Sequence, residues 1–172
     1  RPKLAAGTLQ LGNGGTTGPI GGNVVNNATL AINRSNAYGF AGAISGAGAV
    51  QQRGTGTTTL TGTNTYTGGT TVQAGRLLAG SAGAFVQNTA YTVNGGTLDL
   101  GSWDLTTSNF SGAGGTVALN ARTLTVNQAG DSAFAGAITG AGSTPLLRRR
   151  APCPSRRREL PRFVMSVSCG PF

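Results

Sequence analysis

Few residues of this chain could carry catalytic chemistry. It contains no histidine, and its only acids are Asp99, Asp104, Asp131 and Glu159. Histidine is the commonest general base and the commonest metal ligand, so the chain can use neither histidine base catalysis nor a histidine metal site. Asp99 and Asp104 are five residues apart and could approach each other as a carboxylate pair around a turn. The reading that we favour is that they are two solvated turn acids.

Other signatures of a chemical site are also missing. The sequence has no nucleophile elbow, no phosphate-binding loop and no Cys/His metal spacing. The run GNGG at 12–15 has the glycines of calcium-binding nonapeptide repeats without their repeated aspartate. Trp103 and Tyr66 could be exposed aromatics on a binding surface, although we favour a role in covering the ends of a small core. We therefore predict a non-enzymatic protein with no catalytic residue, no cofactor and no metal.

Basic residues are concentrated at the C-terminal end. Residues 1–143 have a net charge of +3 and residues 144–172 one of +6, which together give the +9 of the chain. The last segment is rich in arginine and proline. Glycine and alanine codons read one base out of frame encode arginine and proline, so a shift of the reading frame would produce this composition. We therefore divide the chain into a folded segment, 1–143, and a basic tail, 144–172. We expect the tail to be disordered or translated out of frame.

The tail allows other interpretations. Arg148–Arg150 and Arg156–Arg158 could bind nucleic acid or anionic lipid. Because no aromatic residue is interleaved with them, we expect no nucleic-acid partner. Cys153 and Cys169 could form a disulfide in an oxidising compartment, but their place in this tail makes them poor evidence for one. The terminal Phe172, which resembles the end of an outer-membrane barrel, we interpret as chance.

The elements that would position any site are short strands. In residues 56–80, GTTTLTGTNTYTGGTTVQAGRLLAG, apolar and threonine residues alternate and glycines separate the runs. The pattern predicts three strands, around Leu60, Val72 and Leu77. The connections are too short for the helical crossover of a βαβ unit. Such strands fit a coil of parallel β-structure, in which each strand pairs with strands of the neighbouring coils.

A period of about 20 residues supports this coil. Leu9 and Leu30 are 21 residues apart, as are Leu77 and Leu98, and Leu119 follows after a further 21. Strand templates such as GTLQLG at 7–12 and GTLDLG at 96–101 predict inward and outward positions. The predicted inward residues are Leu9, Leu11, Leu30, Ile32, Leu77, Ala79, Leu98, Leu100, Leu124 and Val126. The predicted outward, solvated residues are Gln10, Arg76 and Asp99.

Asparagines are predicted to lie at the strand ends, where they favour turns. These are Asn26, Asn27, Asn33, Asn94, Asn120 and Asn127. Stacked turns could form an asparagine ladder. The alternative is a set of ordinary unstacked turn residues, and the sequence does not favour one over the other.

One stretch carries a family resemblance. TGTTTLTGTNTYTGGTTVQAGRLLAG at 55–80, preceded by FAGAISGAGAV at 40–50, strongly resembles the passenger-associated repeat of autotransporters, the type V secretion proteins of Gram-negative bacteria. A second copy begins at Phe134 and breaks off after Ser143. The motif consists of Gly56, Leu60, Gly62, Asn64, Tyr66, Thr67, Gly68, Gly69, Thr70, Val72, Gly75 and Leu77.

The resemblance implies a right-handed parallel β-helix in a secreted passenger. Such passengers are displayed at the outer membrane or released, their folding outside the cell is thought to assist export, and many are adhesins or virulence factors. The implied partners are the protein's own C-terminal translocator barrel, which this chain lacks, and a host or surface ligand. Two alternatives stay open: a passenger whose hydrolase activity lies outside this chain, and a non-functional pseudogene product.

Overall fold

The computed structural model describes residues 2–128, 130–142 and 146–148. Within these residues the regular structure consists of strands β1 to β17, with no helix. No helix long and apolar enough to cross a membrane occurs in the described part of the chain. The prediction of an all-β fold is therefore confirmed. The tail prediction concerns residues 144–172, of which only the backbone of Leu146–Arg148 is described, as strand β17.

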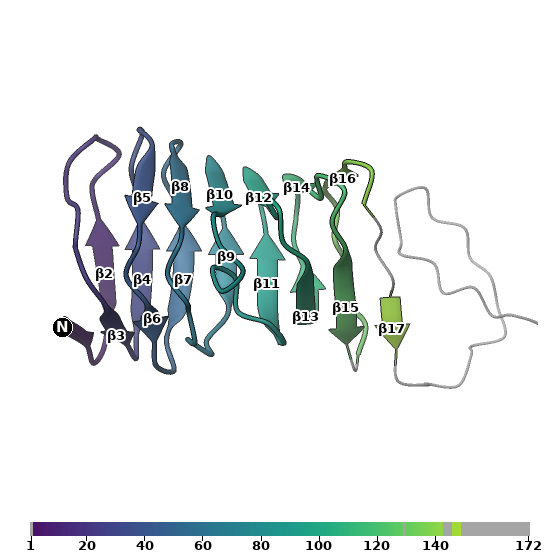
Figure 1. The fold of residues 1–172 in the computed structure, drawn as a ribbon, viewed down its shortest axis with the longest axis horizontal. Helices are drawn as coiled ribbons and strands as arrows, with labels where there is room; N and C mark the ends of the chain where they lie inside the picture. Colours follow the sequence, from purple (N-terminus) through teal and green to yellow (C-terminus); the bar gives the residue numbers. More distant parts are fainter. Residues whose placement is uncertain (1, 129, 143–145, 149–172) are drawn as a thin grey trace, which may run out of the picture.

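The strands form three parallel sheets, and Figure 1 shows that their strands follow one another along the long axis of the molecule. The eight-stranded sheet contains, in spatial order, β17 (Leu146–Arg148), β15 (Leu124–Gln128), β13 (Leu105–Ser111), β11 (Thr89–Val93), β9 (Thr70–Val72), β7 (Ala49–Gln52), β4 (Thr29–Ile32) and β2 (Thr8–Leu11). The six-stranded sheet contains β16 (Ala137–Thr139), β14 (Thr116–Ala118), β12 (Thr97–Asp99), β10 (Arg76–Ala79), β8 (Thr57–Leu60) and β5 (Tyr38–Phe40). The three-stranded sheet contains β1 (Lys3–Leu4), β3 (Val24–Asn26) and β6 (Ile44–Ser45). The chain thus winds as a parallel β-solenoid, as predicted.

The register follows the sequence period. Leu9 pairs with Leu30, and Leu77 pairs with Leu98, at the predicted spacing of 21 residues. The predicted place of Leu119 in the same column is wrong, because Leu98 pairs with Val117. That coil is two residues shorter, so Leu119 moves to the next inward position, where it is still buried.

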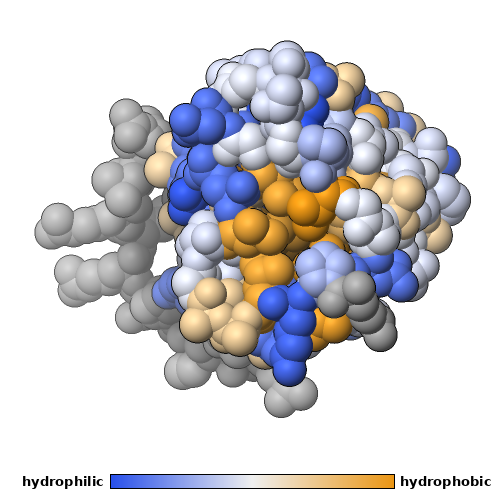
Figure 2. Space-filling view, turned by 90° about the vertical axis from the view of Figure 1, so that its left-hand side faces the viewer, coloured by the Kyte–Doolittle hydropathy of each residue, from blue (hydrophilic) through white to orange (hydrophobic). Residues whose placement is uncertain are grey.

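The predicted inward residues form the core. All of them are buried except Leu9, which is partly buried and packs against the core. Leu9 lies in β2, the edge strand of its sheet at the N-terminal end. Figure 2 views that end and shows an apolar centre within a largely polar rim. Apolar residues of the interior, among them the partly buried Leu9, therefore reach the surface at this end of the described residues.

Asp99 corrects the prediction for the outer face. Gln10 and Arg76 are exposed as expected, but Asp99 is only 2% exposed. Its carboxylate forms an ion pair with Arg76 and accepts hydrogen bonds from Asn120 Nδ2 (2.6 Å) and Gly101 N (2.8 Å). Side chains of the coils before and after it cover this outward position and satisfy its charge. The prediction of a solvated acid is therefore wrong for Asp99.

Asp104 has different surroundings. It is exposed, and its Oδ1 accepts a hydrogen bond from Thr123 N at 2.8 Å. Asp99 and Asp104 are thus bound to separate partners, and the structure shows no contact between their carboxylates. The favoured description as solvated turn acids holds for Asp104 alone.

Candidate functional site in residues 56–77

Ten of the twelve motif residues lie in β8, β9, β10 or the turn between β8 and β9, while Gly56 directly precedes β8 and Gly75 directly precedes β10. Four of them fill the interior: Leu60, Tyr66, Val72 and Leu77 are at most 1% exposed. They lie at alternating positions of their strands or in the turn, so each points into the core while its neighbours point out. The interior of this coil is therefore specified by the motif itself.

Asn64 joins this coil to both of its neighbours. Its side chain is buried, its Oδ1 accepts a hydrogen bond from Ile44 N (2.8 Å), and its Nδ2 donates one to Ala84 O (2.7 Å). Ile44 lies 20 residues earlier and Ala84 20 residues later, so one amide side chain satisfies backbone groups of two flanking coils. The backbone N–H of Asn64 also donates to Gly83 O at 2.9 Å. Replacing Asn64 would leave buried backbone groups on both sides without partners.

Tyr66 and Thr70 form a buried hydroxyl pair. The Tyr66 hydroxyl and Thr70 Oγ1 are 2.6 Å apart, and both residues are buried. Burial raises the pKa of Tyr66 to about 12, because the apolar interior disfavours the phenolate. In the next coil Tyr91 is also buried, which raises its pKa well above the usual value, and its hydroxyl donates to Val86 O at 3.1 Å. The two tyrosines are thus uncharged core residues with satisfied hydroxyls.

Gly56 and Gly75 belong to a column of stacked glycines at one corner of the solenoid. A Cβ added at Gly75 would lie 2.3 Å from Gly56 O, and one at Gly56 would lie 2.2 Å from Asn36 O. The column continues in the same way through Gly96, Gly115 and Gly136. Backbones of successive coils approach too closely here for any side chain. The recurring glycine before β8, β10, β12, β14 and β16, five of the six strands of this sheet, is therefore a packing requirement.

The remaining motif residues complete the turn. An added Cβ would meet backbone atoms of the preceding coil at Gly62 and Gly68, and Gly69 has a φ of +86°. Thr67 is exposed, and its backbone N–H donates to Gly46 O at 3.0 Å. Thr67 is therefore the motif residue whose side chain the fold constrains least.

Sequence reasoning missed one buried polar pair next to the motif. Gln52 is 0% exposed, and its Oε1 accepts a hydrogen bond from Thr58 Oγ1 at 2.7 Å. Its Nε2 donates to Gly54 O at 2.9 Å. Gln52 holds the inward position that Val72 and Val93 hold in the following coils. The sequence did contain an indication of this pair, because Gln52 is a polar residue at an inward position of the strand AVQQ.

The bonds found for these asparagines do not join one asparagine side chain to another as a ladder would, and Asn26 has the ordinary turn role, since its Oδ1 accepts a hydrogen bond from Ala28 N at 3.1 Å. Asn27 and Asn94 reach further. Asn27 Oδ1 accepts from Ala47 N and Asn94 Oδ1 accepts from Ala113 N, each at 3.1 Å. Both bonds reach the following coil, 20 and 19 residues later. The side chains therefore bridge to backbone groups of the next coil, as Asn64 does, and are not stacked on one another. Unlike Asn64, Asn27 and Asn94 are exposed.

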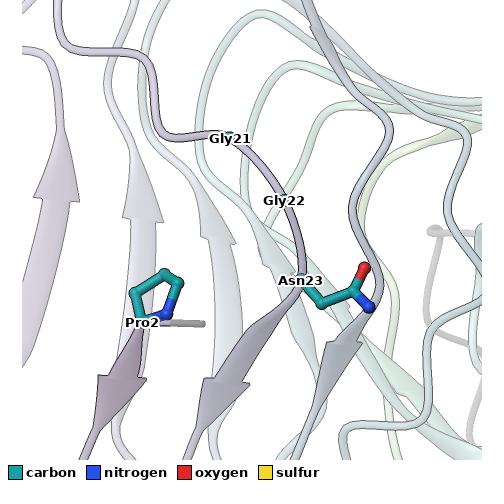
Figure 3. A pocket seen from close by; sticks show the side chains of 4 residues that line it. All are labelled: Pro2, Gly21, Gly22 and Asn23. Carbon is teal, nitrogen blue, oxygen red and sulfur yellow. The ribbon is translucent and has the colours of Figure 1, made fainter.

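Hollows and metal-ligand clusters add no further site to the described residues. A hollow of about 320 Å³ at the N-terminal end is lined by Pro2, Gly21, Gly22 and Asn23 (Figure 3). Asn23 supplies the only polar side chain of this lining, and its Oδ1 accepts from Ala43 N at 2.9 Å. No group of three or more His, Cys, Asp or Glu side chains that could hold a metal ion occurs in the part of the chain that the structure describes.

Comparison with known proteins agrees with this geometry. The model of the passenger-associated-transport-repeat family matches residues 50–79. This chain carries a passenger-associated-transport repeat. All twelve motif residues, and also Gln52 and Thr58, fall within the repeat.

A longer similarity links the chain to an autotransporter. Over 70 residues, 40% of the chain, it is 49% identical to the adhesin BmaC autotransporter of Brucella suis biovar 1 (strain 1330). The chain spans 2% of the length of that relative. No solved structure matches the chain significantly. The repeat thus sits in a segment of autotransporter passenger β-solenoid.

Proposed function

We propose that this segment is a non-catalytic stalk of a passenger displayed at the outer surface of a Gram-negative bacterium or secreted from it, and that its repeat promotes folding and thereby export. The expected partners are a translocator domain of the same protein and a ligand on the host or on another surface. An adhesive role is supported by the similarity to the BmaC autotransporter, which is an adhesin.

The observation that carries the folding role is the two-sided hydrogen bonding of Asn64. A single coil orders many residues but has no neighbour to share its core, so the first two or three coils must form together. Asn64 holds backbone groups of the coils before and after its own with bonds of 2.8 and 2.7 Å. A coil with this residue stabilises a stack of three, which is the smallest unit in which a central coil is covered on both sides.

The test compares Asn64→Ala with Asn27→Ala, because both asparagines bond a backbone N–H 20 residues away but only Asn64 is buried and two-sided. If the repeat nucleates folding, Asn64→Ala slows refolding in proportion to its loss of stability, while Asn27→Ala leaves the refolding rate nearly unchanged. In the full-length passenger, Asn64→Ala should also reduce the amount reaching the cell surface. An Asn64→Ala variant that only unfolds faster, with wild-type refolding and export, would refute the proposal.

A further inference from the structure

One corner of the solenoid combines an exposed tryptophan with exposed charged groups. Trp103 lies in the turn between β12 and β13 and is 40% exposed, and no other large hydrophobic residue of the described chain is exposed. Phe and Tyr side chains of other coils are buried in the core, whereas the indole ring of Trp103 lies at the surface. An exposed indole face is available for contact with a ligand.

The register of β13 and β15, extended back into the preceding turns, sets Arg122 of the next coil opposite Trp103. Leu105 pairs with Leu124 and Leu105 N donates to Thr123 O at 2.9 Å, so the ladder continues backwards to place Asp104 opposite Thr123 and Trp103 opposite Arg122. The bond from Thr123 N to Asp104 Oδ1 follows the same alignment. Neighbouring strands are about 4.8 Å apart, which is close to the width of one sugar ring.

Arg122 and Asp104 have polar groups that could bind a ligand next to Trp103. Arg122 is exposed and takes no part in the ion pair found within the described residues, which joins Arg76 to Asp99. Asp104 is exposed, and the bond to Thr123 N engages its Oδ1. A guanidinium donates up to five hydrogen bonds and a carboxylate only accepts them. The opposite charges of Arg122 and Asp104 offset each other, which favours a neutral ligand with many hydroxyl groups over a highly charged polymer.

The corner is braced before any ligand arrives. Gln87, one coil earlier, donates from Nε2 to Asp104 O (3.3 Å) and accepts at Oε1 from Thr106 N (2.7 Å). On the other side, the tight turn before Arg122 is closed by a bond from Arg122 N to Leu119 O at 2.8 Å. Bonds across three successive coils therefore fix the backbone on both sides of Trp103. Such preorganisation lowers the entropy cost of binding.

We propose that Trp103, Asp104 and Arg122 form a binding site for a neutral saccharide. The indole face stacks on the C–H face of one pyranose ring, while Asp104 accepts from and Arg122 donates to its hydroxyl groups. This proposal names the chemical class of the surface ligand in the proposed function, and it rests on that function in this respect. Binding by the isolated chain, however, does not depend on export, so the two proposals can fail separately.

Trp103 reports on its own site, because it is the single tryptophan of the chain. The experiment titrates the full chain with three neutral tetrasaccharides (cellotetraose, mannotetraose and lacto-N-tetraose) up to about 10 mM, a range that covers weak single-site binding. Polyglutamate serves as the charged probe. We expect a saturable change of tryptophan emission with at least one tetrasaccharide and none with polyglutamate. No saturable change with any tetrasaccharide, or a response to polyglutamate alone, would overturn the proposal.

Variants assign the binding to the three residues. Asp104→Asn keeps an oxygen for Thr123 N, and Arg122→Gln removes the charge, so each should weaken binding roughly ten-fold or more through loss of a charged hydrogen bond. Arg53→Gln is the matched control, since Arg53 lies at another part of the surface and bonds Gln51 Oε1 at 2.8 Å. Trp103→Ala, followed by calorimetry with the same sugar, should abolish binding while the circular dichroism spectrum is unchanged. Equal affinities of Arg122→Gln, Arg53→Gln and the wild type would contradict the assignment.

Discussion

Leu77 and Leu78 are adjacent in β10 but face opposite sides of the sheet, which makes them a matched pair for a stability measurement. Leu77 is 0% exposed and stacks between Thr58 and Leu98 of the neighbouring strands. Leu78 is partly buried on the outer face, in register with Thr59 and Asp99. Both changes to alanine remove the same atoms from the same strand, so the change in intrinsic strand propensity is the same for the two variants.

The two variants should differ by several kilocalories per mole. Leu77→Ala leaves a cavity that the coils above and below cannot fill, so we expect a loss of about 3–4 kcal/mol in the free energy of unfolding, within the range for buried Leu→Ala changes. Leu78→Ala loses only partly buried surface, and we expect about 1 kcal/mol or less. A loss of the first size is a large part of the stability of an ordinary domain.

Urea unfolding followed by circular dichroism and by Trp103 fluorescence measures both values. Coincident transitions by the two probes would justify a two-state treatment, which stacked coils do not guarantee. If Leu78→Ala cost as much as Leu77→Ala, or more, the assignment of inner and outer faces would be refuted.

Three further predictions concern single residues. Gly42→Ala should lower the free energy of unfolding in urea by about 2 kcal/mol or more, since the added Cβ would lie 1.9 Å from Gly22 O. The control Gly39→Ala, which has open space around its Cβ, should change the same free energy by about 0.5 kcal/mol or less. Asp99→Ala should cost about 1–2 kcal/mol in the same assay, because it removes the ion pair and two hydrogen bonds of a buried carboxylate while its more exposed partners can bond to water instead; a loss below about 0.5 kcal/mol would show that the ion pair is dispensable. Tyr66 keeps its proton up to a pH of about 12 when folded but only to about 10 when unfolded, so stability should be complete below pH 10 and fall between pH 10 and 12. Tyr66→Phe should make that alkaline decline shallower, and an unchanged decline would contradict the assignment.

Much of this fold could be predicted from the sequence, because each coil repeats one simple rule. Aliphatic residues two apart must share a face of a strand, and their recurrence after about 20 residues must stack them. Leu77 over Leu98 and Leu9 over Leu30 follow directly from this rule. Val117 in place of Leu119 does not, because the length of a corner turn depends on contacts between coils and not on the strand pattern.

The segment FAGAI shows where local sequence fails. In its first copy, Phe40 lies in β5 of the six-stranded sheet and Ile44 in β6 of the three-stranded sheet. In its second copy, Phe134 makes an isolated bridge to Gly112 and Ile138 lies in β16 of the six-stranded sheet. The same five residues therefore occupy different sides of the solenoid, and the neighbouring coils decide which.

Prediction of the candidate site was partial for the same reason. The sequence identified the motif residues but assigned them no contacts, since the partners of Asn64 are backbone groups 20 residues away in either direction. It also placed Asp99 in solvent, because an outward position in one strand says nothing of the side chains that cover it from the adjacent coils. Burial of Asp99 by Arg76 and Asn120 is a property of three coils together.

The stacking of successive coils in parallel register is tested most directly by disulfide cross-linking on the outer face of the eight-stranded sheet. Thr71 pairs with Thr92, and Thr92 pairs with Ser111, so Thr71 and Ser111 are two strands apart. In a background with both native cysteines replaced by serine, Thr71→Cys with Thr92→Cys should oxidise to a disulfide, since Cα atoms of neighbouring strands are about 4.8 Å apart. Thr71→Cys with Ser111→Cys, at roughly twice that spacing, should stay reduced. Cross-linking of the second pair but not of the first would contradict the solenoid.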